Sequence, residues 1–208
     1  DPSELEYVDG ALTAHGQKID MVYNRLVDFA FEEPDHVLLK QAYLDGAVVV
    51  TPNPHVHAML ANKQNLTLLS DSQTLRDWGL DEAAVDCLEK SVPRTKIVSR
   101  DDAAELWHTR RQLFFKPVSG YGSKGVYRGS KLTRRVFENI LDEEYIAQTF
   151  VPAGERSLKI DDIVTNRKID IRLYTYGGKL LLPAARVYQG QATNFRTLGG
   201  GFAPVFQV

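Results

Sequence analysis

The chain has little of what marks a secreted or membrane protein. Only one of its 208 residues is a cysteine, Cys87, so no internal disulfide can form and nothing indicates an oxidising compartment. Its longest apolar runs, such as 47–50, are far shorter than the roughly 18 residues that a helix needs to cross a bilayer. The first residues, 1–4, have neither the basic nor the apolar region of a signal peptide, and the missing initiator methionine suggests a fragment. We therefore expect a cytoplasmic protein that does not bind a membrane.

The net charge is small, but the charged side chains are unevenly distributed along the chain. The net charge is −2, yet residues 1–60 hold ten acidic and three basic side chains, whereas residues 111–208 hold eight acidic and fifteen basic ones. A basic half indicates an anionic ligand, either nucleic acid or a small polyphosphate, although two halves docked on each other would give the same pattern. That half lacks alternating basic and aromatic residues and any recognisable groove-binding motif. We therefore expect no nucleic-acid partner.

What is present is an ordinary globular composition, 43% apolar and 10% aromatic, in which strand and helix patterns alternate. Strand patterns at 19–23 and 47–51 flank a helix at 36–44 capped by Asp35, a βαβ-like unit that favours a parallel sheet. Further helices are predicted at 55–69, 71–78, 81–90 (capped by Asp81), 101–109 (capped by Asp101) and 133–141. Further strands are predicted at 96–98, 112–117, 125–128 and 145–151, with a hairpin of 170–176 and 179–188 across Gly177-Gly178. The fold class is α+β, with a small Rossmann-like piece followed by two α+β lobes.

The most informative segment is 114–126, in which a strand delivers Lys116 and a loop with three glycines and two serines follows. Glycine permits positive φ and close approach, so such a loop can wrap backbone N–H groups around phosphate oxygens, to which the lysine adds charge. The spacing differs from a Walker loop, and the next element is a strand. The alternative is a glycine-rich hairpin turn with a surface lysine.

Four more segments form a pattern with this loop when they are taken in chain order. They are Asn53-Pro54, then Asn62-Lys63 on the helix at 55–69, then Val92-Pro93-Arg94-Thr95, and finally a strand at 144–151 that runs on to Glu155. Together these motifs resemble the ATP-grasp superfamily, well over 48–155 and more loosely over 156–208. The resemblance implies two α+β lobes that clasp a nucleotide: an N-terminal lobe at 61–145 and a C-terminal lobe at 146–208, preceded by the Rossmann-like segment at 1–60.

The resemblance also implies roles for single residues. Lys63 and Lys116 would bind the ATP phosphates, and Glu155 the ribose hydroxyls. The mobile loop over the phosphates would consist of Ser119, Gly120, Tyr121, Gly122, Ser123 and Gly125, and the adenine hinge of Gln148, Thr149, Phe150 and Val151. Without the resemblance, Lys63 would be a solvated helix lysine, Gln148 a satisfied strand side chain and Glu155 an exposed turn acid.

The C-terminal segment resembles ligases of the glutathione synthetase type. Asp170 and Arg172 share one face of a strand by its period of two, and Arg186 lies on the return strand, with Arg196 later. In such ligases, arginines of this kind bind the substrate carboxylate or the acyl-phosphate transition state. The resemblance therefore makes Arg172, Arg186 and Arg196 catalytic candidates.

The metal site departs from the superfamily. Its members hold two Mg²⁺ ions with an acidic Glu-x-Asn pair and a separate Asp, whereas this chain has no Asp or Glu after Asp170. Three explanations are open. Asp170 could bind the metal together with the neutral oxygens of Asn194 and either Gln189 or Gln191. Otherwise the metal-binding strand lies beyond Val208, or the site is degenerate.

The function that the resemblance implies is an ATP-dependent ligase with Mg²⁺ as cofactor and a small-molecule carboxylate and amine (or thiol) as substrates. The carboxylate would attack the γ-phosphate of ATP, and the amine or thiol would attack the resulting acyl phosphate. The alternative is a degenerate ATP-grasp module that binds nucleotide or a partner protein without catalysis. A homodimer is compatible with either. Asn24-Arg25 follows the first strand, where open α/β sheets place ligands, so it is a candidate substrate contact or a surface salt bridge.

Overall fold

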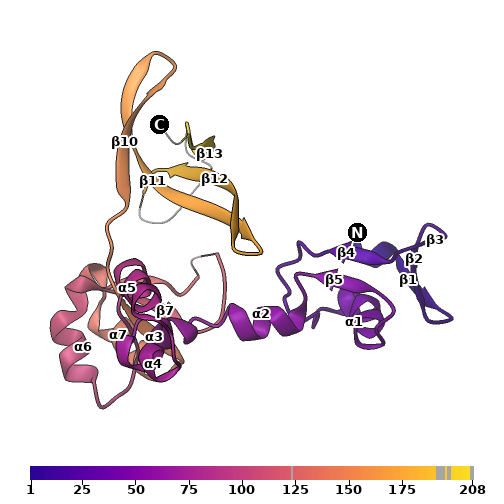
Figure 1. Cartoon of the computed structure of the whole chain (residues 1–208), viewed down its shortest axis with the longest axis horizontal. Coiled ribbons are helices and arrows are strands. Elements are labelled where there is room, and N and C mark those ends of the chain that lie inside the picture. The colour runs from indigo at the N-terminus through magenta and orange to yellow at the C-terminus, as the bar shows by residue number, and fades with distance from the viewer. Residues whose placement is uncertain (123, 191–194, 196–197, 207–208) are drawn as a thin grey trace. The chain divides into compact units, whose positions relative to one another are not determined.

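A computed structural model describes residues 1–122, 124–190, 195 and 198–206 (Figure 1). The chain divides into two compact units, residues 1–149 and residues 150–208. The first unit contains helices and strands, and the elements described in the second unit are strands, which agrees with the predicted α+β class. In the part that the structure describes, no helix is both long and apolar enough to span a bilayer.

The N-terminal part contains one parallel strand pair, as predicted. Strands β4 (Met21–Tyr23) and β5 (Val49–Thr51) are parallel and connect through helix α1 (Val37–Leu44). An antiparallel sheet of β1 (Leu5–Val8), β2 (Ala11–Ala14) and β3 (Gln17–Lys18) precedes them, after the 3₁₀ helix η1 (Pro2–Glu4). The prediction missed this sheet. Two parallel strands are fewer than a Rossmann sheet needs, so the Rossmann-like description stays a prediction.

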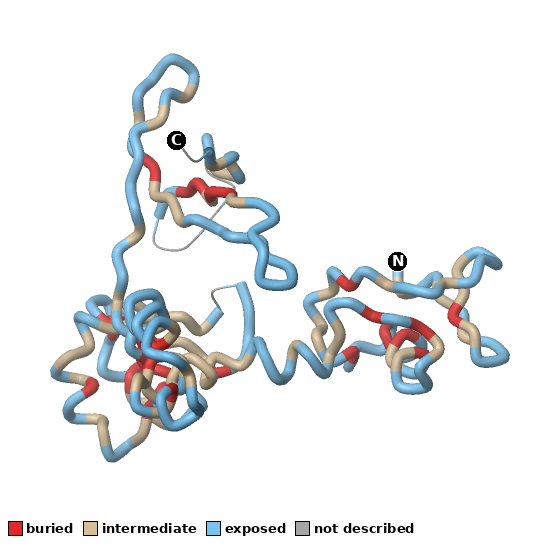
Figure 2. Tube along the Cα trace, in the orientation of Figure 1, coloured by how far each residue is buried: buried red, intermediate tan, exposed pale blue. Residues whose placement is uncertain are grey.

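A small core of its own stabilises this part. Its buried side chains come from β2, α1, β5, the residue before β5 and the loop before the 3₁₀ helix η2 (Pro34–His36), and Figure 2 shows buried segments of this part beside exposed ones. They are Leu12, Phe31, Leu39, Ala42, Val48 and Val50. Helix α1 begins after η2, with His36 at its N-cap. The prediction that Asp35 caps this helix is therefore wrong, because Asp35 lies inside η2.

Asp28 makes this part sensitive to acid. Its Oδ2 accepts from the Glu33 N–H at 2.8 Å and lies 2.7 Å from His36 Nδ1. Burial raises the pKa of Asp28, but these two bonds and the Glu32 N–H more than offset it and lower the pKa to about 2. The folded state thus favours the carboxylate, which stabilises the fold above pH 4, and this stabilisation is lost as pH falls from about 4 to 2.

We expect the free energy of unfolding, measured with urea, to fall by about 1 kcal/mol more in the wild type than in Asp28→Asn between pH 7 and pH 3. Parallel losses in both proteins would contradict this role.

The helix predicted at 55–69 is in fact two helices, α2 (Pro54–Leu60) and α3 (Asn65–Leu69). The break has a local cause, because Asn62 Oδ1 accepts from the Gln64 N–H at 2.8 Å and so competes with helical hydrogen bonds. Lys63 therefore lies in a turn and not on a helix, which corrects the prediction. Its backbone N–H donates to Val118 O at 3.1 Å, which joins this turn to the glycine loop.

Two further helices, α4 (Ser72–Asp77) and α5 (Glu82–Ser91), lead to strand β6 (Thr95–Ile97). Asp81 caps α5 as predicted, accepting from the Ala84 N–H at 2.7 Å. Helix α6 (Ala103–Thr109) has Asp102 at its N-cap and is followed by the 3₁₀ helix η3 (Arg110–Gln112). The predicted cap by Asp101 is wrong by one residue.

The sheet that carries the candidate site is antiparallel, in the order β6-β9-β7-β8. It consists of β6, β7 (Leu113–Pro117), β8 (Tyr127–Arg128) and β9 (Tyr145–Thr149), with η4 (Gly129–Lys131) and α7 (Arg134–Leu141) between β8 and β9. Phe115 of the sheet and Phe137 of α7 are fully buried and meet edge to face at 5.9 Å between ring centroids. Burying such aromatics contributes much of a domain's stability, so this core fixes the strand that bears Lys116.

The second unit is a four-stranded antiparallel sheet in chain order. Its strands are β10 (Gly154–Ile160), β11 (Ile163–Tyr176), β12 (Lys179–Tyr188) and β13 (Gly201–Pro204). The predicted hairpin is confirmed, since β11 and β12 pair across Gly177 and Gly178, both of which have positive φ.

Candidate functional site

The site begins with Lys116, near the end of β7. Its side chain is half-buried, and its Nζ donates to Gln148 Oε1 on the neighbouring strand β9 at 2.6 Å. β7 and β9 are paired in the middle of the sheet, with Lys116 opposite Ile146. The register thus places Gln148 two residues along from the partner of Lys116, within reach of a long side chain.

Lys63 reaches the same region from the turn between α2 and α3. Its Nζ donates to Gly120 O at 3.0 Å and lies 3.5 Å from Val118 O. Together with the backbone bond to Val118, these contacts hold Lys63 against the start of the glycine loop. The chain brings together two lysines that are 53 residues apart in sequence, as the resemblance implies.

A pocket of about 220 Å³ lies between the two lysines and the loop. It is lined by Lys63, Lys116, Pro117, Gly120, Tyr121, Gly122, Lys124 and Val126. Burial lowers the pKa of Lys63, and burial together with the nearby Lys63 charge lowers the pKa of Lys116. The hydrogen bonds of both ammonium groups go to neutral oxygens. Among the described residues, neither lysine forms an ion pair with an acid, so the pocket carries positive charge that favours an anionic ligand.

The loop has the backbone that close approach to an anion requires. Gly120, Gly122 and Gly125 have φ values of +111°, +66° and +66°. Gly125 is further fixed by Tyr145, whose hydroxyl donates to Gly125 O at 2.9 Å and would lie 2.9 Å from a Cβ at this position. Ser119 is exposed, and Ser123 lies outside the described residues.

The residues predicted for adenine and ribose fall in both units. Gln148 and Thr149 end the first unit, whereas Phe150, Val151 and Glu155 belong to the second. Glu155 is exposed on β10, opposite Lys168. The Gln148 side chain is buried and hydrogen-bonded at both its oxygen and its nitrogen, so it is a satisfied strand residue as well as a neighbour of Lys116.

The second unit brings Asp170 and Arg186 together. Arg186 Nε and Nη2 donate to the two Asp170 oxygens at 2.5 and 2.9 Å, a bidentate ion pair. Arg172 is exposed on β11. The other predicted residues here, Gln191, Asn194 and Arg196, lie outside the described residues, and Gln189 is exposed.

The acidic side chains that the structure describes do not form a magnesium site. No group of three or more potential His, Cys, Asp or Glu ligands occurs among them. Asp170, the predicted ligand, directs both oxygens to Arg186. These donors do not fit a Mg²⁺ ion, and we assign no step to a protein-bound metal.

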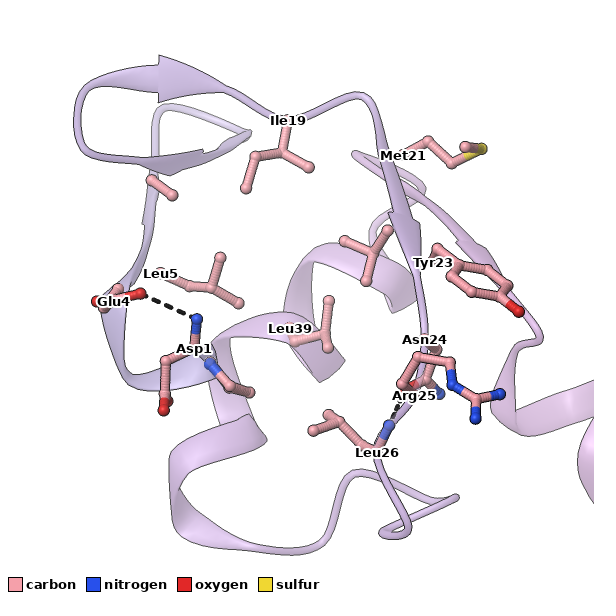
Figure 3. Close-up of a pocket in the computed structure, with 13 residues that line it drawn as sticks. Asp1, Glu4, Leu5, Ile19, Met21, Tyr23, Asn24, Arg25, Leu26 and Leu39 are labelled. Atoms are coloured by element: carbon pink, nitrogen blue, oxygen red, sulfur yellow. Dashed lines mark hydrogen bonds and ion pairs between the residues drawn. The ribbon is translucent and has the colours of Figure 1, made fainter. Parts of the chain in front are cut away.

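A second, largely apolar pocket of about 450 Å³ lies in the N-terminal part beside Asn24 and Arg25 (Figure 3). Asn24 is buried, accepts from the Leu26 N–H at 2.9 Å and donates to Pro52 O at 3.3 Å. Its role is thus to hold the chain after β4. Arg25 stacks its guanidinium 5.9 Å from the Tyr23 ring centroid.

Sequence reasoning missed the structural part played by Thr95. This residue is buried at the start of β6, and its Oγ1 accepts from Gln148 Nε2 at 2.9 Å. The only signal in the sequence was its place in the Val-Pro-x-Thr motif.

No protein-family model and no curated protein matches the sequence. Solved structures do match. D-alanyl-alanine synthetase A from Vibrio cholerae O1 biovar eltor is 13% identical with a TM-score of 0.46, covering 96% of this chain and 55% of that one. The ATP-grasp ligase PsnB complexed with a minimal precursor is 19% identical with a TM-score of 0.45, covering 92% and 66%.

PsnB complexed with a phosphomimetic variant of the precursor, Mg and ADP is 17% identical with a TM-score of 0.47, covering 90% of this chain and 62% of that one. PsnB is named an ATP-grasp ligase, and the sequence motifs described above resemble the same superfamily. The chain spans 55 to 66% of the length of these three structures.

Proposed function

We propose that this ATP-grasp-like chain binds ATP and takes part in an ATP-dependent ligation of a carboxylate to an amine or thiol. The observation that carries the proposal is the pocket in which Lys63, Lys116 and the glycine loop converge. Its two ammonium groups contact neutral oxygens, and burial and mutual repulsion lower the pKa of Lys116. A polyphosphate would relieve this repulsion, because its charge neutralises both lysines.

The pocket also has donors that a polyphosphate could use. A lysine ammonium has three hydrogens, of which Lys116 uses one for Gln148. Gly120 and Gly122 have positive φ and no side chains, so the loop backbone at these two positions can approach phosphate oxygens. In the proposed assignment, Lys63 and Lys116 bind phosphates, and the loop at 119–125 covers them and keeps out water. The backbone groups of the hinge at 148–151 would meet the adenine edge, and Glu155 would bind the ribose hydroxyls.

The proposed chemistry needs stabilisation of the transferred phosphoryl group. A carboxylate oxygen attacks the γ-phosphorus, the bond to the ADP oxygen breaks, and an acyl phosphate forms. The amine or thiol then attacks the acyl carbon, loses its proton and releases inorganic phosphate. Fixed cations beside the phosphoryl group lower the barrier of the first step, and Lys63 and Lys116 are the candidates. Arg172, Arg186 and Arg196 remain candidates for orienting the carboxylate.

The Asp170–Arg186 ion pair favours the second candidate, a degenerate module that binds nucleotide without catalysis. Arg186 binds both oxygens of Asp170, the predicted metal ligand, and the acids that the structure describes form no cluster for Mg²⁺. The ligase should release ADP when carboxylates and amines are supplied with Mg²⁺, whereas the module should bind ATP and release none.

Thermal unfolding with ATP, with and without Mg²⁺, tests ATP binding, which both candidate functions require. At 100 times Kd, a bound nucleotide adds about 2.7 kcal/mol to the free energy of unfolding and raises Tm. We expect this rise with ATP and a smaller one with adenosine, because the pocket recognises the phosphates. Equal curves with and without ATP at millimolar concentration would contradict the proposed nucleotide site.

A further inference from the structure

A chain of hydrogen bonds ends at the Lys116 ammonium. Lys116 Nζ donates to Gln148 Oε1 at 2.6 Å, and Gln148 Nε2 donates to Thr95 Oγ1 at 2.9 Å. Thr95 Oγ1 in turn donates to Pro93 O at 2.8 Å. Gln148 and Thr95 are 7% and 4% exposed and lie directly opposite each other in the pairing of β9 with β6. The bond between Gln148 and Thr95 is therefore shielded from water, and it joins the edge strand β6 to its neighbour β9.

The direction of these bonds is fixed by chemistry. Pro93 O can only accept, so the Thr95 hydroxyl hydrogen points to it and the hydroxyl lone pairs face Gln148. The amide nitrogen of Gln148 must therefore face Thr95, and its oxygen must face Lys116. The opposite orientation would place an NH₂ group against the ammonium. The Thr95 backbone is held as well, since its N–H donates to Ser70 Oγ at 3.0 Å.

A neutral acceptor has a different effect on Lys116 from that of an acid. The amide oxygen fixes the ammonium with one bond and leaves its full charge and two of its hydrogens for a ligand. A carboxylate at position 148 would form an ion pair and cancel the charge that attracts an anion. An apolar residue there would leave the ammonium without this bond.

We propose that Thr95 and the Gln148 side chain are positioning residues for Lys116, which aim its ammonium into the glycine-loop pocket and keep its charge available for phosphate. The proposal rests on the proposed nucleotide site and adds to it a role for two residues that act through Lys116. The two residues are expected to matter for binding of the phosphates and not for binding of adenosine.

The test measures the affinities of the full chain for ATP and for adenosine by titration calorimetry. Thr95→Val removes the hydroxyl at nearly constant volume, so the amide loses its orienting acceptor. We expect Thr95→Val to weaken ATP binding about tenfold, the effect of one lost hydrogen bond of this kind, and to leave adenosine binding unchanged. Thr95→Ser keeps the hydroxyl and should bind ATP as the wild type does. Gln148→Glu should weaken ATP binding more, and its affinity should depend less on salt.

The double variant Thr95→Val with Lys116→Met separates positioning from general damage to the fold. If Thr95 acts through Lys116, the Thr95→Val change should have no further effect on ATP once Lys116 is gone. Equal weakening of ATP and adenosine, the same loss in Thr95→Ser, or the full tenfold loss in the Lys116→Met background would overturn the positioning role. A wild type that binds no ATP would instead contradict the proposed nucleotide site itself.

Discussion

Replacing Lys116 by methionine should weaken ATP binding roughly 10- to 100-fold and abolish ligase turnover, while the free energy of unfolding stays the same or rises. The loss follows because Lys116 is one of the three lysines, with Lys63 and Lys124, that line the pocket of the glycine loop. The gain follows from the pKa of Lys116, which burial and the charge of Lys63 lower. A lowered pKa means that the folded state disfavours the charged form, so removing the charge at pH 7 relieves a cost. Weaker binding with equal or greater stability is typical of a residue retained for function.

The measurement pairs calorimetric ATP titration with urea unfolding, and Lys90→Met is the matched control. Lys90 has an exposed side chain on α5, 3.5 Å from Asp86, and no part in the pocket. It should bind ATP as the wild type does and lose at most about 0.5 kcal/mol of stability. ATP affinity or turnover unchanged by Lys116→Met would refute the phosphate assignment of this lysine.

The glycine loop beside Lys116 could be predicted because its pattern is local. A strand, a lysine and three glycines within 114–126 determine a turn with positive φ and a charge beside it. The connection from Lys116 to Thr95 could not be predicted. It depends on which residues of β6, β7 and β9 face each other, and Thr95 and Gln148 are 53 residues apart.

The ion pair of Asp170 and Arg186 shows how a small irregularity changes a site. In a regular hairpin that begins with Tyr176 opposite Lys179, Asp170 would face Ala185. A bulge between Tyr174 and Thr175 shifts the register by one residue and brings Arg186 opposite Asp170. A bulge leaves no periodic signal in the sequence. The sequence therefore could not indicate that Asp170, predicted as a metal ligand, pairs with Arg186.

Two errors in the fold have similar local causes. The break at Asn62 interrupts an apolar pattern that is periodic on both sides, because a side-chain oxygen replaces a helical acceptor. The strands β1 to β3 have two to four residues each, too few for an alternating pattern to stand out. Length and hydrophobic periodicity therefore predicted the buried elements better than the short or interrupted ones.

Gly129→Ala should destabilise the first unit by roughly 3 kcal/mol or more. A Cβ at Gly129 would lie 1.8 Å from Arg110 O, 2.7 Å from Arg110 C and 2.9 Å from Leu113 O. All three are backbone atoms, so no rotamer change can make room. Gly129 begins η4 against η3 and the first residue of β7, and the alanine would have to push these segments apart.

The control for this substitution is Ser130→Ala. Ser130 is the next residue of η4 and is exposed, so the loss should stay below about 0.5 kcal/mol. Urea unfolding followed by tryptophan fluorescence suits the comparison, because Trp107 lies 5.2 Å from Phe137 between ring centroids in the same core. A loss below 1 kcal/mol in Gly129→Ala would show that η3 and η4 pack less closely than described. A large loss would show that this contact holds the start of β7, the strand whose later residue Lys116 lines the pocket.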